Sequence, residues 1–248
     1  MKTKMKMLIV LACAVVIVAS SVLGTLAYLT DEAEAVNTFT VGKVAIKLDE
    51  AKVNPDGTPV AGADRVTANE YHLIPGGTYT KDPTVTVLAD SETSYVRMLL
   101  TVVDSDAVDA LIANPIHNLT DYAGLFEGWD TTSWLYQGFT KGTTEVTENG
   151  TPVTKNTITF EFWYKETVAG AAGADVTLPA LFTAVKIPAT ATGDEMATLG
   201  NVQVVVNAHA IQAAGFADTV DPATGTVTAT AQANAWAAFS AQTQSTNP

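Results

Sequence analysis

The feature that most constrains the fold is a strict alternation of apolar and polar residues after the middle of the chain. Every second position in this stretch is apolar: Ile158, Phe160, Phe162 and Tyr164. Successive side chains of a β-strand point to opposite faces, so a period of two predicts a strand with one buried face. The same period of two recurs nearer the C-terminus, at Val202, Val204, Val206, Ala208 and Ala210. Long alternating strands therefore dominate the prediction.

Turn residues separate these strands from several others. Further strands are predicted at 39–48, 84–88 and 95–103, a strand end within 71–79 that Pro75-Gly76-Gly77 closes, and a strand or extended connector at 181–187. Asn149-Gly150 between two β-prone segments predicts a hairpin, and Asn54–Gly57 and Pro75-Gly76-Gly77 predict turns. Helices are predicted only as short pieces, at 105–114 with Ser105 as the N-cap, at 194–199 and at 234–239. This pattern predicts an all-β, jelly-roll-like β-sandwich with a few short helices.

The N-terminus has the three parts of a secretory signal. Three lysines within the first six residues precede an apolar run at 7–19, and small residues follow up to Ala27. We predict a signal peptide at 1–27, cut between Ala27 and Tyr28, with a cut near Gly24 as the alternative. The chain would then touch the membrane only through the uncleaved signal.

Two other interpretations of this segment remain open. Residues 7–27 are about as long as the ~20 residues that cross a bilayer, which would suit a retained helix. Acidic residues rather than a basic stop-transfer cluster follow, and this disfavours that alternative. Lipidation of Cys13 is the second alternative, although the apolar stretch before that cysteine is short.

Charge and cysteine content exclude several functions. The formal net charge is −13 at pH 7, and it becomes −16 without residues 1–27, which carry three lysines and no acid. Nucleic acids and anionic membranes attract basic surfaces, so no nucleic-acid partner is expected. Cys13 is the only cysteine of the sequence. The rest of the chain has no disulfide, no thiol nucleophile and no cysteine ligand for a metal.

No recognisable motif for catalysis is present. The histidines His72, His117 and His209 lie far apart in the sequence, and neither H-E-x-x-H, G-x-S-x-G nor a phosphate-binding loop occurs. Asp104, Asp106 and Asp109 gather at a strand-to-helix junction, where calcium could bind, but a solvated helix start is the preferred interpretation. We therefore expect no catalytic residue, no cofactor and no metal.

Four stretches, taken in order, resemble one family. They are "GTLAYLTDEAEAVNTFTVGKV" at 24–44, "IPGGTYTKDPTVTV" at 74–87, "SYVR" at 94–97, and "VNAHAIQAAGF" at 206–216 with the later "AWAAF" at 235–239. In this order they resemble the secreted TasA/camelysin group of Gram-positive bacteria. The middle of the chain, from about 114 to 200, has no counterpart in this resemblance, and 220–234 resembles an insertion.

The resemblance implies a secreted structural protein of the cell surface or biofilm extracellular matrix. Members are released by a SipW-type signal peptidase, and some form fibres by donating the freed N-terminal strand to the next subunit. It implies a donor segment at 28–37 with the anchors Tyr28, Leu29 and Val36, a jelly-roll domain at 38–214, and a tail with a short helix at 215–248.

The partners that this resemblance implies are copies of the chain itself, other matrix proteins and the signal peptidase. An enzyme is not expected. Two alternatives stay open: a non-polymerising surface adhesin or accessory matrix protein, and a camelysin-type metalloprotease, for which the sequence supplies no metal motif.

Overall fold

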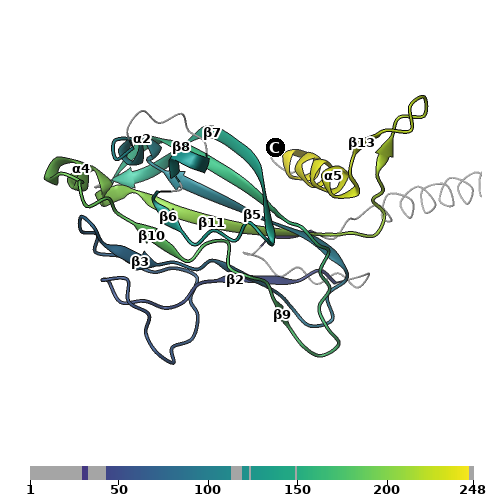
Figure 1. The fold of residues 1–248 in the computed structure, drawn as a ribbon, viewed down its shortest axis with the longest axis horizontal. Helices are drawn as coiled ribbons and strands as arrows, with labels where there is room; N and C mark the ends of the chain where they lie inside the picture. The colour runs from purple at the N-terminus through teal and green to yellow at the C-terminus, as the bar shows by residue number, and fades with distance from the viewer. Residues whose placement is uncertain (1–29, 33–42, 113–118, 123, 149, 246–248) are drawn as a thin grey trace, which may run out of the picture.

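The structure is a computed structural model of the 248-residue chain, and it describes residues 30–32, 43–112, 119–122, 124–148 and 150–245. Figure 1 shows two layers of antiparallel strands with one long helix outside them. The prediction of an all-β, jelly-roll-like sandwich with few helices is confirmed. Within the described ranges, no helix is long and apolar enough to cross a membrane.

The first layer is a five-stranded antiparallel sheet. In spatial order its strands are β1 (Thr30–Glu32), β11 (Gln203–Gln212), β5 (Ser94–Val103), β8 (Thr151–Tyr164) and β7 (Trp134–Glu148). Strand β8 carries the alternation that opens the sequence analysis, and its Ile158, Phe160 and Phe162 are buried. The two long predicted strands are thus both present, one on each side of β5.

Two three-stranded sheets form the second layer. One contains β2 (Ile46–Asp49), β4 (Thr84–Val87) and β9 (Val176–Thr177), and the other contains β3 (Thr78–Thr80), β10 (Ala184–Lys186) and β6 (Phe126–Glu127). The core lies between the layers and includes Val85, Met98, Phe160 and Phe182, all fully buried. Burying each such side chain contributes roughly 1.5–3 kcal/mol, so this shared core is the main source of stability.

Helices occupy the connections and the C-terminus. They are α2 (Ser105–Asp109), α3 (Leu119–Tyr122), α4 (Gly193–Thr198), the 3-10 turn η2 (Leu199–Asn201) and α5 (Ala231–Ser245). A small hairpin, β12 (Thr219–Val220) with β13 (Val227–Ala229), precedes α5. Helix α5 is much longer than the predicted 234–239.

The predicted N-cap of α2 was wrong. Asp104, not Ser105, is the cap residue, and its backbone has φ 64° with no side-chain cap hydrogen bond. Asp104 is engaged elsewhere, because its carboxylate pairs with Lys155 Nζ at 2.7 Å. Ser105 is instead buried in the first turn. A capping pattern in the sequence does not reveal such a competing ion pair.

The strand end predicted before the turn at 75–77 is a loop, and pairing begins only at β3, after the turn. The cause is Tyr79, whose hydroxyl accepts a hydrogen bond from Ile74 N at 2.6 Å and donates one to His72 O at 3.0 Å. The chain folds around this buried ring, and a Cβ on Gly77 would lie 2.5 Å from the hydroxyl oxygen. The turn at Asn54–Gly57 is confirmed, with Gly57 N bonded to Asn54 O at 2.8 Å.

Helix α5 covers part of the outer face of the five-stranded sheet (Figure 1). Two of the four stretches behind the family resemblance meet there, 94–97 and the last one, 206–216 with 235–239. The guanidinium of Arg97 lies 4.6 Å from the ring centre of Trp236 and 4.9 Å from that of Phe239. Arg97 also donates to His209 Nδ1 at 3.1 Å and pairs with Glu161 at 3.0 Å. A cation between aromatic rings is favourable when shielded from water, so Arg97 fastens the helix to the sheet.

Candidate functional site

A groove of about 880 Å³ separates the two layers at the β11 side of the sandwich. One wall is Val202 together with the inner face of β11, which contributes Val204 and Val206. The opposite wall is the loop 67–73 together with Tyr79. A groove with these apolar walls and a polar rim suits an extended peptide segment better than a small charged substrate.

The groove also exposes a backbone edge. All residues from 202 to 206 line it in succession, so the edge of β11 faces the groove as well as its alternate side chains. One side of β11 pairs with β5 along its whole length. On the other side, the described strands include a partner only for residues 209–211. Unpaired strand edges accept a further strand readily.

That partner is β1, which comes from the predicted donor segment 28–37. It runs antiparallel to β11, with Thr30 opposite Ile211, Asp31 opposite Ala210 and Glu32 opposite His209. Strand β1 therefore occupies the part of the edge that continues directly into the groove. The predicted cleavage residues Ala27 and Tyr28 and the predicted anchors Tyr28, Leu29 and Val36 lie outside the described residues.

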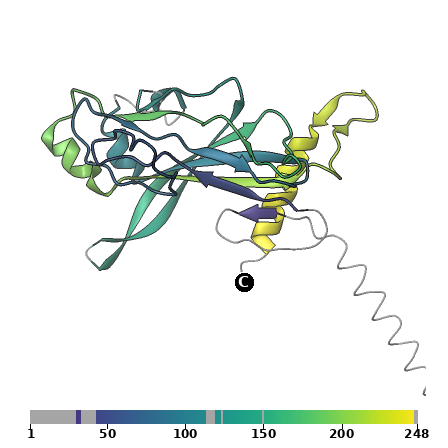
Figure 2. The ribbon, with the colours of Figure 1, turned by 90° about the horizontal axis from the view of Figure 1, so that it is seen from below.

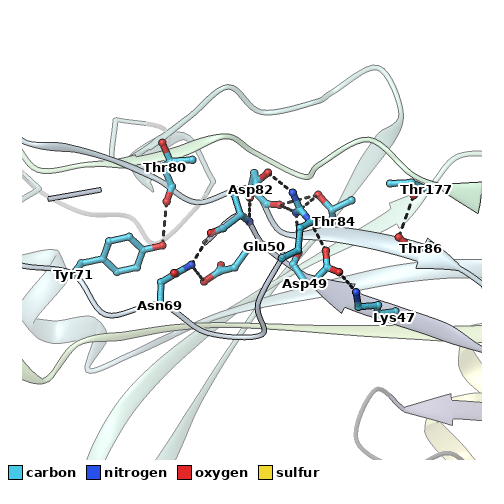
Figure 3. Close-up of polar contacts among 12 residues, drawn as sticks. Lys47, Asp49, Glu50, Asn69, Tyr71, Thr80, Asp82, Thr84, Thr86 and Thr177 are labelled. Carbon is cyan, nitrogen blue, oxygen red and sulfur yellow. Dashed lines mark hydrogen bonds and ion pairs between the residues drawn. The ribbon is translucent and has the colours of Figure 1, made fainter. Parts of the chain in front are cut away.

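A buried ion pair stiffens the rim of the groove. Glu50, only 4% exposed, accepts a hydrogen bond from Lys81 Nζ and another from Asn69 Nδ2 at 2.9 Å. Asn69 further donates to Ala51 O at 2.8 Å, and Tyr71 donates to Thr80 O at 3.1 Å (Figure 3). Burial and the Glu50 carboxylate raise the pKa of Tyr71, so this hydroxyl stays a donor at neutral pH. The loop 67–73 is thus held at Asn69 and at Tyr71.

A second ion cluster holds the same region from behind. Arg65 bonds to Asp49, to Asp82 Oδ2 at 2.9 Å and to Thr84 Oγ1 at 2.9 Å. Burial alone would raise the pKa of Asp49, but hydrogen bonds from Lys47 and Arg65 outweigh it and lower that pKa below its usual range. Figure 3 shows these carboxylates side by side at the ends of β2 and β4. The segment between β2 and β3 is therefore a fixed wall, although it contains almost no regular structure.

The two clusters explain the Lys-Asp-Pro motif of the sequence. Lys81 reaches Glu50, Asp82 reaches Arg65 and the backbone N of Ala51, and Pro83 follows directly before β4. One tripeptide thus holds the irregular segment at its start, residues 50 and 51, and at Arg65. The sequence did not predict that Glu50, Arg65 and Asn69 take part in these clusters. Ion pairs and hydrogen bonds between residues 16 to 31 positions apart leave no periodic signal.

The candidate catalytic and metal positions do not assemble. Asp104 pairs with Lys155, Asp106 accepts a hydrogen bond from Asn156 at 2.8 Å, and Asp109 accepts one from Tyr122 at 2.8 Å. Their carboxylates are thus engaged by three different partners. Over the ranges that the structure describes, no three His, Cys, Asp or Glu side chains come together as metal ligands would.

The histidines are equally dispersed. His72 contributes its carbonyl to the Tyr79 hydroxyl, and His117 lies outside the described residues. The ring of His209 stacks on Phe239 at 4.9 Å. Burial and the positive charge of Arg97 lower the pKa of His209 to about 4, so it is neutral near pH 7 and part of the α5 contact. Comparison with family models, with curated proteins and with solved structures finds no match for the chain.

Proposed function

We propose that this chain is a secreted structural protein of the TasA/camelysin type, a fibre-forming subunit of the cell surface or biofilm matrix. In this proposal a SipW-type peptidase cuts between Ala27 and Tyr28, and the segment 28–37 is then donated to the groove of the next subunit. Two observations support this proposal: the four sequence stretches that follow one another as in this family, and the groove beside β11.

One observation carries the proposal. The segment that follows the predicted cleavage site already pairs, through β1, with the edge of β11 beside the groove. This edge therefore accepts that sequence in an antiparallel register. A second copy of the same segment would find the same backbone groups and the same apolar wall, which is the physical basis of strand addition.

The register specifies how a donated strand would lie. Each residue further along the donor moves one residue back along β11, so Val36 of a donor would lie opposite Val205. Val205 belongs to the outer set of β11 residues and Val206 to the set that lines the core. In that register Ala35 and Asn37, opposite Val206 and Val204, would point into the groove, and Val36 would point outward. Of the three predicted anchors, Tyr28 and Leu29 would lie opposite residues 213 and 212, beyond the groove, so none of the three would fill it.

The same pairing also favours a second candidate. Because β1 pairs with β11 of its own chain, a subunit can cover this part of its edge without a neighbour. A non-polymerising surface adhesin or accessory matrix protein would use the segment in this way. The two candidates differ in whether the strand is exchanged between subunits.

Negative-stain microscopy of the exported protein tests the proposal directly. Regular fibres are expected from the complete mature chain, and compact particles from a variant that lacks 28–37. A synthetic peptide of residues 28–38 should raise the melting temperature of that variant, whereas a scrambled peptide of equal composition should not. Compact particles from the complete chain under all assembly conditions would favour the second candidate instead.

A further inference from the structure

The opposite edge of the five-stranded sheet is formed by β7 (15 residues), and among the described strands none pairs with its outer side. Every pairing that the structure gives for β7 is with β8, on the inner side. Two large apolar side chains on it are unusually exposed: Leu135 at 50% and Phe139 at 38%. A long edge strand of this kind is a template for another strand unless something covers it.

Strands β7 and β8 continue past the sandwich as a two-stranded arm. Strand β5 supports β8 only as far as the pair Val103–Thr157, so the arm at 143–156 has no third strand in the described chain. Figure 2 shows this teal hairpin projecting from the body at the lower left. Its base is fastened by Lys155 to Asp104 and by Asn156 to Asp106. Isolated hairpins are marginally stable in water, so an exposed arm gains from a further strand.

A bulge limits where an added strand could pair. The register of β7 shifts between Tyr136 and Gly138, where Gly138 has φ 134°. From Gly138 to Glu148 the ladder with β8 is regular. This regular edge is centred on Thr143, which lies equally far from both of its ends.

The side chains of this edge complement themselves. Beyond the bulge, one face carries Phe139, Lys141, Thr143, Glu145 and Thr147, and all five are exposed. Lys141 and Glu145 have opposite charges at equal distances from Thr143, and no ion pair is seen for either within the described part of the chain. They cannot pair with each other, because four residues along one strand span about 13 Å.

We propose that two copies of the chain join edge to edge through antiparallel pairing of β7 with β7, on a two-fold axis at Thr143. This pairing places Lys141 opposite Glu145 of the partner twice, and Phe139 opposite Thr147 of the partner twice. Opposite charges directly across an antiparallel pair are favourable. The arrangement is self-complementary, as a two-fold interface requires, and it joins both sheets into one.

This interface is separate from the groove. It lies at the far edge of the same sheet, three strands away from β11, and it uses none of the residues of the strand-donation proposal. If subunits also exchange N-terminal strands, the β7 contact would link neighbouring fibres laterally. If they do not, it would give a dimer.

Charge exchange is the first test. In Lys141→Glu and in Glu145→Lys, like charges face each other, so self-association should fall roughly tenfold in each. The double variant Lys141→Glu/Glu145→Lys should restore it. An equimolar mixture of the two single variants should also associate, because each now complements the other. Both positions are exposed, so melting temperatures should stay unchanged.

Cysteine cross-linking tests the register in the full chain, with Cys13→Ser removing the only other thiol. Directly opposite residues of an antiparallel pair have Cα atoms about 4.5–5.5 Å apart, which suits a disulfide. Thr143→Cys should therefore cross-link to itself on a non-reducing gel roughly tenfold faster than Thr147→Cys. In a mixture of the two variants Phe139→Cys and Thr147→Cys, each variant should cross-link to the other.

Two results would overturn the proposal. One is equal cross-linking of Cys at 143 and at 147, and the other is a double charge variant that associates no better than the single ones. Cross-linking at 143 is read from the disulfide-linked dimer band, so it does not depend on whether fibres form. The failure of strand donation and the failure of this interface are therefore distinguishable.

Discussion

The two edges of the five-stranded sheet differ in what lies beside them. At the β11 edge, β1 pairs with residues 209–211, and residues 202–206 line an apolar groove with a fixed wall. At the β7 edge, no described strand pairs with the outer side. This edge carries the exposed charges of Lys141 and Glu145, whereas the β11 edge carries valines. An apolar edge needs a bound strand to be soluble, whereas a charged edge is soluble alone and selects only complementary partners.

The largest expected effect concerns the core on which both edges depend. Phe160 is fully buried in the part of β8 inside the sandwich, whereas Thr154 is exposed on the arm. Phe160→Ala should lower the free energy of unfolding by about 3–5 kcal/mol, because it leaves a cavity. Thr154→Ala should change it by less than about 0.5 kcal/mol. Urea denaturation measures both, and similar losses would mean that the arm is as firmly folded as the core.

Two lysines sharpen the contrast between the groove and the arm. Lys81 is paired with buried Glu50, and its removal would leave that carboxylate without its cation. Lys81→Met should therefore cost about 3 kcal/mol, near the lower end for a broken buried pair. The matched variant Lys141→Met should cost less than about 0.5 kcal/mol. Thermal unfolding of the two variants at one pH measures these losses. An unchanged stability of Lys81→Met would mean that the groove wall does not depend on the Lys81–Glu50 pair.

The α5 contact beside the β11 edge should respond to acid. The pKa of His209 in the folded protein is about 4, below its ordinary value of 6.5. Between these values the folded state binds fewer protons than the unfolded state, so stability should fall as the pH drops from 6.5 to 4. The loss attributable to His209 should be about 2–3 kcal/mol. It is measured as the difference between the original chain and His209→Gln over this window, and parallel pH profiles would contradict it.

The smallest expected effect concerns the helix at one end of the groove. Thr192 and Glu195 form a reciprocal capping box at α4, and the next turn carries Leu199, which lines the groove. Thr192→Ala should lower stability by about 1 kcal/mol. Helix α2 lacks a side-chain cap, so Ser105→Gly there tests packing rather than capping. Calorimetry compares the two variants, and an unchanged melting temperature for Thr192→Ala would show that the cap is dispensable.

Sequence reasoning worked where a local pattern carried the information. The period of two at Ile158–Tyr164 and Val202–Ala210 predicted β8 and β11. The Asn149-Gly150 pair predicted the hairpin that joins β7 to β8. Sequence reasoning failed at 71–74, where the buried Tyr79 ring holds the chain in a loop, and at the cap of α2, where Lys155 engages Asp104. The groove could not be predicted, because its walls come from the segments 48–83, 102–126 and 185–206, and no local rule gives their distance in space.

The short pairing of β1 with its own β11 has a kinetic consequence if subunits exchange N-terminal strands. A tethered segment competes for the edge at a high effective concentration, so a dilute subunit would remain closed. Within the described residues the pairing comprises three residues, so opening would be frequent. Assembly would then show a lag and a threshold concentration, and preformed ends, which already present an open edge, would remove the lag. The stability of the β1–β11 pairing would therefore set the subunit concentration that export must reach before polymerisation begins.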